Sequence, residues 1–583
     1  MNATFAVAAI VLQAIGPGPD SVEALRKSAR RAEAQFERLA RQLAPVKFSS
    51  MNGTQCDEIV GRFCLRYDVG EVPAPPEEPP RVSLARRFAI EALRHAYSYR
   101  AEELATSGPL IRYLVEDDRA AEAASAARTF AALSGDSIWG PLLLGFAVHA
   151  AQDDTAAERL FAEALGRMGA EDRRRIENVE WLLSAADRGR YRALDESAKR
   201  AFEDVLWAFS DPLYLTPGNE RRNQHFARHV WSRVLERAPV VAGMVRWGRD
   251  LEELTVRYGI PQGRTRSPGT AYREGSLVEH FDPDQLAYVP EDLLARGAPP
   301  TPLPGETWAL ENPRNRSGFA PATLRKLRPL EHQLTRIPAG DSVVLRVDAA
   351  MPLDSAAAGA DSVLAGLWVL SEGRSVGRVQ RSVRPRADTA RFSLEITAPP
   401  GEFLYSAEGL EPVSRLAGRA RYVTDLPART GGLALSDPIL AHAFGGAALP
   451  AHRSDARLRP HTSLVFPAQD TVGLYAEVHG LRPAADGRTS YRVELSLRRA
   501  DRASLPARVV SWLGRRLGLS SPEVPPRLSW EAAGGAGSPA IVAVDLPLDV
   551  DGEGLFILAA RVTDLASGER AESDRLLRIG DPR

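Results

Sequence analysis

Four landmarks decide the fold between Trp207 and Pro261: Asp211-Pro212, Thr216-Pro217-Gly218-Asn219-Glu220, Trp247-Gly248-Arg249-Asp250 and Tyr258-Gly259-Ile260-Pro261. The residues before the first landmark have the spacing of an amphipathic helix, which the proline ends. Asn219 is suited to cap a second helix, and Glu220 in its first turn complements the helix dipole. Structural roles therefore explain most of this stretch.

The sequence upstream of this stretch predicts a helical repeat region. Ser83–Met168 is rich in alanine and leucine at helical spacing, and Leu144-Gly145 is followed by Ala157, Phe161 and Ala164. This spacing matches the tetratricopeptide pattern, in which small residues let two antiparallel helices pack closely and an aromatic ring fills the gap. The repeat is degenerate, and alanine-rich hairpins of other kinds remain an alternative.

Downstream, the spacing of apolar residues changes from every third or fourth residue to every second residue, which predicts antiparallel β-sandwiches. Gly, Pro and Asp turns separate the segments, and a boundary between two β-domains is expected near Pro427–Pro460. The expected strands are Val343–Val347, Val363–Leu370, Arg391–Ile396, Thr471–Val478, Tyr491–Leu497, Ile541–Leu546 and Leu555–Val562.

Length and charge limit the possible partners. The chain has 583 residues, more than one hydrophobic core supports, so several domains are expected. Its 74 Lys and Arg are balanced by 75 Asp and Glu. Nucleic-acid binders need a broad positive field, and adhesion to anionic membranes needs basic clusters. We therefore expect no nucleic-acid partner and no membrane-surface binding.

The N-terminus has the pattern of an export signal. Phe5–Ile15 is apolar and uncharged, and Gly16-Pro17-Gly18-Pro19 would end any helix. This run is too short to span a bilayer but fits a signal peptide cleaved near Ala14, although no basic residue precedes it. A buried N-terminal helix is the alternative. We expect a periplasmic or extracellular protein without an integral membrane span after cleavage.

The two cysteines agree with export. Cys56 and Cys64 form a close pair in a chain that otherwise lacks cysteine, which suggests a local disulfide in an oxidising compartment. Two ligands are too few for a structural zinc site. Two unrelated free thiols are the alternative, and they would accompany a cytoplasmic repeat protein.

The region from Trp207 to Leu294 resembles the GWxTD domain of bacterial proteins. Trp247 and Asp250 match its namesake motif, and the Tyr-Gly-x-Pro turn is kept, whereas Arg246 replaces glycine and Arg249 replaces threonine. The resemblance implies a bacterial protein in which a signal peptide and helical repeats precede the module. It implies no particular reaction.

A basic loop and a histidine follow the motif and suggest a binding site. Guanidinium groups suit bidentate contacts with carboxylate or phosphate, so an anion-binding pocket is one hypothesis. The alternative is a solvated loop with a structurally hydrogen-bonded histidine. The candidate binding residues are Trp247, Asp250, Tyr258, Arg264, Arg266 and His280.

The chain lacks the familiar catalytic signatures. It has no Gly-x-Ser-x-Gly elbow and no phosphate-binding Gly-x-x-x-x-Gly-Lys. His225 and His229 lie one helical turn apart and could share a metal, but the intervening Phe-Ala-Arg lacks the glutamate of a zinc protease, so packing histidines are favoured. We expect no cofactor, no metal and no catalytic residue.

These observations predict an α-helical repeat region, a central α+β module and C-terminal antiparallel β-sandwich domains. The favoured function is non-enzymatic binding or scaffolding among proteins of the cell envelope, and the alternative is a hydrolase that acts on peptide or glycan through the module. The expected boundaries are 1–19 for the signal peptide, 20–82 for the first helix, cysteine pair and proline-rich linker, 83–200 for the repeats, 201–325 for the module, and 326–430 and 431–583 for the sandwiches, the second immunoglobulin-like.

Overall fold

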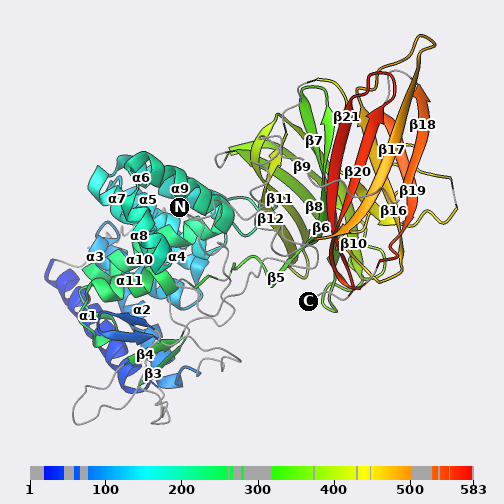
Figure 1. The fold of residues 1–583 in the computed structure, drawn as a ribbon. Coiled ribbons are helices and arrows are strands. Elements are labelled where there is room, and N and C mark those ends of the chain that lie inside the picture. The colour runs from blue at the N-terminus through cyan, green and yellow to red at the C-terminus, as the bar shows by residue number, and fades with distance from the viewer. Residues whose placement is uncertain are drawn as a thin grey trace, which may run out of the picture. The chain divides into compact units, whose positions relative to one another are not determined.

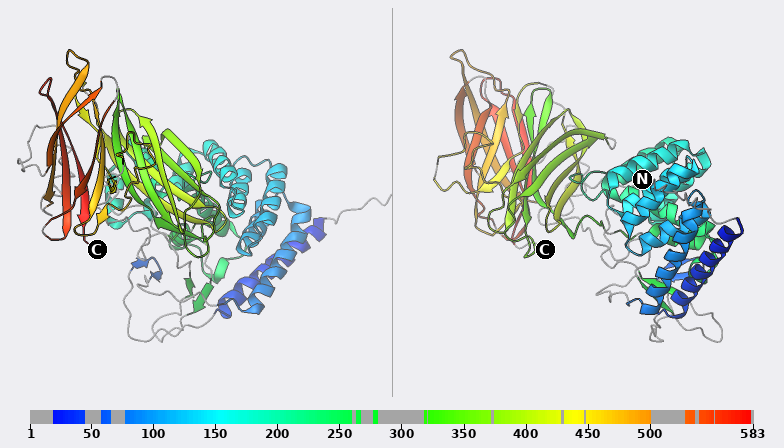
Figure 2. Two further views of the ribbon diagram at one scale, coloured as in Figure 1. Left: turned by 90° about the vertical axis from the view of Figure 1, so that its right-hand side faces the viewer. Right: turned by 180° about the vertical axis from the view of Figure 1, so that it is seen from behind.

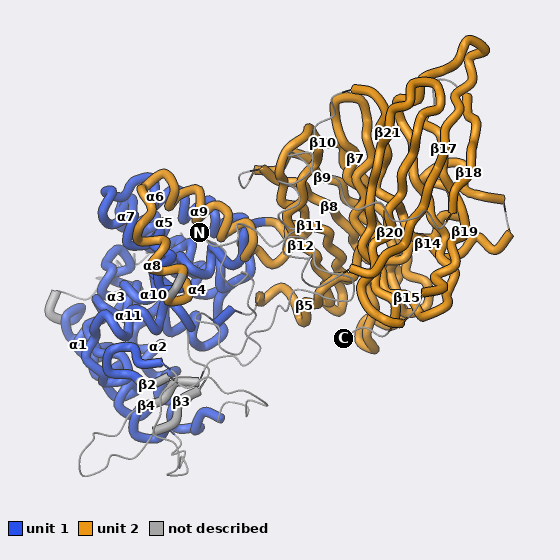
Figure 3. The backbone as a smooth tube through the Cα atoms, in the orientation of Figure 1, with its two compact units in different colours: residues 1–182, 218–285, 313–320 blue, residues 183–217, 286–312, 321–583 orange. Residues whose placement is uncertain are grey.

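The computed structural model divides into two compact units (Figure 3). Unit 1 comprises residues 1–182, 218–285 and 313–320, and unit 2 comprises residues 183–217, 286–312 and 321–583. The structure describes residues 19–44, 58–65, 77–259, 263–266, 277–280, 318–319, 321–371, 374–427, 431–446, 448–500, 528–535, 539–550 and 552–580.

Unit 1 is built around antiparallel helices that follow one another in sequence (Figure 1). In both views of Figure 2, α1 and α2 run side by side. The helices are α1 (Pro19–Gln42), α2 (Pro80–Arg100), α3 (Leu104–Glu116), α4 (Ala120–Ser134), α5 (Trp139–Ala150), α6 (Asp154–Arg167), α7 (Ala170–Glu177), η1 (Glu180–Leu182), α10 (Glu220–Arg237), η2 (Ala242–Met244) and α11 (Arg249–Tyr258).

Small residues allow the close packing that the repeat spacing predicts. A Cβ on Gly145 of α5 would lie 2.8 Å from the ring of Phe161 on α6, so only glycine admits this aromatic ring. Ala157 and Ala164 on α6 are fully buried. The α5–α6 hairpin therefore has the packing that the sequence indicates.

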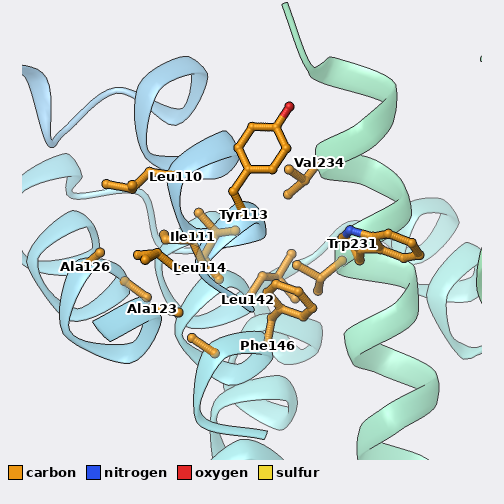
Figure 4. Close-up of a cluster of buried hydrophobic side chains, with 14 of the residues drawn as sticks. Leu110, Ile111, Tyr113, Leu114, Ala123, Ala126, Leu142, Phe146, Trp231 and Val234 are labelled. Atoms are coloured by element: carbon orange, nitrogen blue, oxygen red, sulfur yellow. The ribbon is translucent and has the colours of Figure 1, made fainter. Parts of the chain in front are cut away.

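Helix α10 covers the side of the array formed by α3, α5 and α6. Figure 4 shows Trp231 and Val234 of α10 beside Tyr113 of α3 and Phe146 of α5. These side chains belong to one buried cluster that extends from α1 to α10. The side of the helical array lined by α3, α5 and α6 is thus covered by the chain's own helix.

The described residues of unit 1 also include two short hairpins. The first consists of β1 (Glu58–Val60) and β2 (Phe63–Leu65), and the second of β3 (Gly263–Arg266) and β4 (Leu277–His280). Both are antiparallel.

Unit 2 contains two β-sandwiches and the helices α8 (Ala185–Ala193) and α9 (Glu196–Ser210). In the first sandwich, a sheet of order β10-β7-β6 packs on a sheet of order β5-β12-β11-β8-β9 around one apolar core. The strands are β5 (Lys326–Pro329), β6 (Glu331–Ala339), β7 (Ser342–Pro352), β8 (Val363–Ser371), β9 (Arg374–Val383), β10 (Thr389–Ala398), β11 (Gly401–Glu411) and β12 (Leu416–Leu426).

The second sandwich has its own core. One sheet has the order β13-β16-β14 with β19 paired to β16, and the other has the order β15-β21-β20-β17-β18. The strands are β13 (Ala434–Leu435), β14 (Ile439–His442), β15 (Val465–Phe466), β16 (Thr471–His479), β17 (Arg488–Arg499), β18 (Leu528–Gly535), β19 (Ala540–Pro547), β20 (Gly554–Asp564) and β21 (Arg570–Ile579).

The predicted fold class is confirmed: helices precede largely antiparallel β-sandwiches. The module expected over 201–325 coincides with neither unit, because residues 201–217 group with the sandwiches and residues 218–285 with the helices. Among the described residues, no helix is both long and apolar enough to cross a bilayer. Residues 1–18 and Cys56, with the side chain of Cys64, lie outside the description, so the signal peptide and the disulfide stay predictions.

Candidate functional site

The Trp-Gly-x-Asp landmark forms the start of α11. Gly248 is the N-cap in an extended conformation, and Asp250 lies in the first turn, where a carboxylate complements the helix dipole. The indole of Trp247 is half-buried and packs against the helical core of unit 1. The landmark therefore joins a helix start to the core.

The Asp250 carboxylate is held by Arg62, from the turn between β1 and β2. Arg62 Nε lies 2.6 Å from Asp250 Oδ2, and Arg62 Nη2 lies 2.8 Å from Oδ1. The backbone N–H of Arg62 also donates to Oδ2 at 3.1 Å, and that of Leu251 donates to Oδ1 at 2.9 Å. These contacts, the Arg62 side chain foremost, lower the pKa of Asp250 to about 2. The carboxylate is ionised at neutral pH, and both of its oxygens accept hydrogen bonds within the fold.

Two glycines permit this close approach. Gly61 has a φ of +52°, and a Cβ there would lie 2.5 Å from the Cβ of Asp250. A Cβ on Gly248 would lie 2.9 Å from Asp250 Oδ1. Larger residues at either position would push the hairpin away from α11.

A second ion pair fixes the hairpin to the other end of α11. Arg257 is fully buried and contacts Glu58 of β1 at 2.7 and 3.1 Å. It also donates to the hydroxyl of Tyr258 at 2.8 Å. The Tyr258 ring is buried with Val60 and Leu254. The hairpin is thus attached to α11 by charge at both ends and by apolar contact between them.

Arg228 of α10 caps the C-terminus of α11. Its Nη1 donates to the carbonyl oxygen of Arg257 at 2.7 Å, and a Cβ on Gly259 would lie 2.7 Å from its Nε. Gly259 has a φ of +79°, which a side chain disfavours. Burial, followed by repulsion from Arg221, holds the pKa of Arg228 well below its usual value. Tyr258 and Gly259 therefore lie at the junction between α10 and α11.

The predicted anion-binding residues lie on the second hairpin. Arg264 is opposite Glu279, and His280 is opposite Gly263. The side chains of Arg264, Arg266 and His280 lie outside the described parts of the chain, so their gathering around Asp250 stays a prediction. Among the described side chains, an arginine that contacts Asp250 is Arg62, which was not predicted from the sequence. The only local feature of the sequence that marks Arg62 is the Gly61-Arg62 turn close to Cys64.

A second polar centre lies between α1, α3 and η2. The Glu37 carboxylate accepts from Arg112 Nη2 at 2.9 Å, from the Tyr113 hydroxyl at 2.8 Å and from the Gly243 N–H at 2.7 Å. Glu37 is fully buried. One carboxylate therefore ties three elements of unit 1 together, and sequence spacing gave no signal of it.

Glu33, one turn before Glu37, is a second buried acid beside this centre. Burial raises its pKa to about 7, against the attraction of Arg112 and with added repulsion from Glu37. This carboxyl therefore changes charge near neutral pH, unlike Asp250.

The histidines of α10 are core residues. His225 Nε2 lies 3.0 Å from the Ile176 carbonyl oxygen, and the His229 ring stacks on Trp181 with centroids 6.2 Å apart. Burial lowers the pKa of both, to about 3 for His229, which keeps both rings neutral. Within the described residues, no cluster of three or more His, Cys, Asp or Glu side chains could hold a metal ion.

The landmark around Gly218 packs on the α5–α6 turn. Gly218 has a φ of +82°, and a Cβ there would lie 2.9 Å from the carbonyl carbon of Asp154. The predicted N-cap is confirmed, because the Asn219 side chain accepts from the Arg222 N–H at 2.9 Å. Asn223 then donates to the Asp154 carboxylate at 3.0 Å.

The Asp211-Pro212 landmark is anchored within unit 2. Arg421 and Arg419 of β12 donate to the Asp211 carbonyl oxygen at 2.6 and 2.7 Å. Arg421 also forms a fully buried ion pair with Glu408 at 2.7 Å and lies 3.9 Å from the centroid of the Tyr214 ring. The four landmarks that are continuous in sequence thus stabilise two different units.

No protein-family model and no curated protein matches this chain. Among solved structures, Escherichia coli alpha-2-macroglobulin activated by porcine elastase aligns with 53% of this chain at 10% identity and a TM-score of 0.14. The aligned part spans 24% of that macroglobulin chain, and a likeness of this size carries no argument about fold or function.

Proposed function

We propose that this protein is a non-enzymatic binding or scaffolding protein of a bacterial cell envelope, which acts through contacts with other envelope or secreted proteins. The observation that carries the proposal is the engagement of Asp250. Its two oxygens accept from Arg62 and from two backbone N–H groups, and its pKa of about 2 leaves no proton to donate at neutral pH. An acid or base catalyst needs a pKa near the working pH and a free approach to substrate.

The β-part of the chain supports the same proposal, because buried polar contacts join its two sandwiches. The side chain of Gln333, fully buried on β6, donates to the Leu440 and His461 carbonyl oxygens at 2.9 and 2.7 Å and accepts from the Leu440 N–H at 2.8 Å. Arg336 adds a two-oxygen ion pair with Asp437 at 2.7 and 3.1 Å. Such fixed junctions suit a protein that holds partners at set positions.

The test is to recover the tagged full-length chain from its own envelope fraction after mild crosslinking. The proposal expects a reproducible partner protein at near-equal amount, with the tagged chain absent from the cytosol. As a control, the purified chain is assayed for hydrolysis of peptide and cell-wall glycan beside Asp250→Asn. Hydrolysis by the wild-type chain that Asp250→Asn abolishes would overturn the proposal in favour of the hydrolase alternative.

A further inference from the structure

Strand β9 lies at the edge of the first sandwich. It is the last strand of the five-stranded sheet, and among the described residues it pairs only with β8. An edge strand presents a row of backbone N–H and C=O groups with which an added strand can pair. The ten residues of β9 make this edge about 30 Å long at the rise of a strand.

Strand β6, at the edge of the three-stranded sheet, shows how this chain satisfies such an edge. The backbone N–H of Asp437, from the second sandwich, donates to the Arg336 carbonyl oxygen at 3.0 Å, and the Arg336 N–H donates to Asp437 Oδ2 at 3.0 Å. The Arg336 guanidinium also binds both oxygens of the Asp437 carboxylate. A segment with an acidic side chain therefore docks on this edge strand through its backbone and its carboxylate together.

The β9 edge carries positive charge without matching carboxylates. Residues 373–387 contain five arginines and no aspartate or glutamate. All five arginines are exposed, and none forms an ion pair with a residue in the described parts of the chain. Arg381 donates to the backbone carbonyl oxygen of Ser393 on β10, which leaves its charge unneutralised. The arginines of the β9 edge are Arg374, Arg378, Arg381, Arg384 and Arg386.

These arginines lie on both faces of the sheet edge. Arg378 is opposite Trp368 of β8 and Arg381 is opposite Ala365, and residues three apart in a strand point to opposite faces. A second copy of β9 would bring arginine against arginine, which the like charges disfavour. A strand with carboxylates would instead meet an arginine on either face while its backbone pairs with the edge. A nucleic acid would contact the arginines through its phosphates but has no peptide groups to pair with the edge.

We propose that the β9 edge is the docking site for an acidic extended segment of a partner protein, which adds a strand beside β9. The backbone of the segment pairs with the N–H and C=O groups of the edge, and its Asp and Glu side chains pair with the arginines. The inference rests on the proposed binding function and names the class of partner. Because one added strand buries a small surface, we expect a dissociation constant of about 10 to 100 μM.

The test is fluorescence polarisation of the full-length chain with a labelled peptide of alternating Glu and Thr, as long as β9. The proposal expects saturable binding by this peptide. The same peptide with an N-methylated backbone keeps its charge and loses its N–H donors, so it should bind about tenfold more weakly or worse. A peptide with Lys in place of Glu should not bind the wild-type chain.

A charge reversal tests the arginines. The double variant of Arg378→Glu and Arg381→Glu should bind the Glu-Thr peptide about tenfold more weakly or worse, and it should gain binding of the Lys-Thr peptide. Arg570→Glu is the matched control, because Arg570 is exposed on β21 of the second sandwich, and it should change the affinity less than about twofold. Melting curves establish that each variant is folded.

Three results of these titrations would overturn the proposal: no saturable binding up to about 1 mM, equal binding of the N-methylated peptide, or unchanged affinity of the double variant. A single-stranded oligonucleotide that binds as tightly as the Glu-Thr peptide would also overturn it, because the edge would then be a general site for polyanions. Peptide binding without an envelope partner would contradict only the proposed function, whereas an envelope partner without peptide binding would contradict only this inference.

Discussion

Glu33 gives the most quantitative prediction. Only 2% of its surface is exposed, and its pKa is about 7 in the folded chain against 4.5 for an ordinary glutamate. The folded state therefore binds a proton more tightly than the unfolded state. Stability contributed by the protonated carboxyl is present at low pH and is lost as the pH rises from about 4.5 to 7.

Replacing Glu33 by glutamine keeps the size of the side chain and removes the charge. The difference between a pKa of about 7 and one of 4.5 corresponds to about 3 kcal/mol, so Glu33→Gln should stabilise the α1 region by about that amount at pH 8. At pH 5 the carboxyl is almost fully protonated in the folded state and about a quarter protonated in the unfolded state, so the gain should fall below about 1 kcal/mol.

The assay is hydrogen exchange of the α1 amides, corrected for intrinsic rate, at pH 8 and at pH 5. Glu23→Gln is the matched control, because Glu23 lies on the same helix with an exposed side chain. It should change protection little at either pH. Equal protection of wild type and Glu33→Gln at pH 8, or loss of protection of the same size at both pH values, would refute the reasoning.

Three further predictions follow from named contacts. Arg62→Ala should detach the β1–β2 hairpin, seen as faster exchange and proteolysis of residues 58–65, at a cost of only about 1 kcal/mol because the Arg62 side chain is 49% exposed. Intact protection of the hairpin would contradict it. Arg421→Met should destabilise the first sandwich by about 3–5 kcal/mol, because it leaves the buried Glu408 carboxylate without its ion-pair partner. The control Arg492→Met removes the exposed ion pair with Glu531 and should cost less than about 1 kcal/mol. Equal melting temperatures of the two variants would contradict this prediction. Burial lowers the pKa of His332 to about 4, so the stability that its neutral ring contributes is present above about pH 6.5 and is lost as the pH falls. In denaturant titrations, the destabilisation of His332→Phe relative to wild type should therefore shrink by about 2 kcal/mol between pH 7.5 and pH 5. An unchanged difference between the two pH values would rule this out.

The sequence predicted elements that depend on local pattern. Alternating segments such as Tyr491–Leu497 and Ile541–Leu546 lie within β17 and β19, because a half-buried strand must alternate. Several strands escaped prediction. Among them, the exposed β9 and the two-residue β13 and β15 have few or no alternating apolar residues. Asn219 was identified as an N-cap because capping needs only the adjacent turn.

Contacts between distant residues were beyond sequence reasoning. Arg62 and Asp250 are 188 residues apart, and nothing local marks the arginine as the partner of this aspartate. Likewise, Asp211 groups with the sandwiches because Arg419 and Arg421 bind its carbonyl oxygen, so a stretch that is continuous in sequence divides between two units. The packing of α10 on α3 and α5 is likewise a contact between distant parts of the sequence, which no local pattern predicts.

The most direct test of the central claim, that Asp250 holds the hairpin and performs no reaction, is a double-mutant cycle on Arg62 and Asp250. The quantity measured is the amount of envelope partner retained by wild type, Arg62→Ala, Asp250→Asn and the double variant. If the two residues act only through their ion pair, each single variant should lose the same share, and the double variant should lose no more. If Asp250→Asn retained no partner while Arg62→Ala retained as much as wild type, the result would contradict the account.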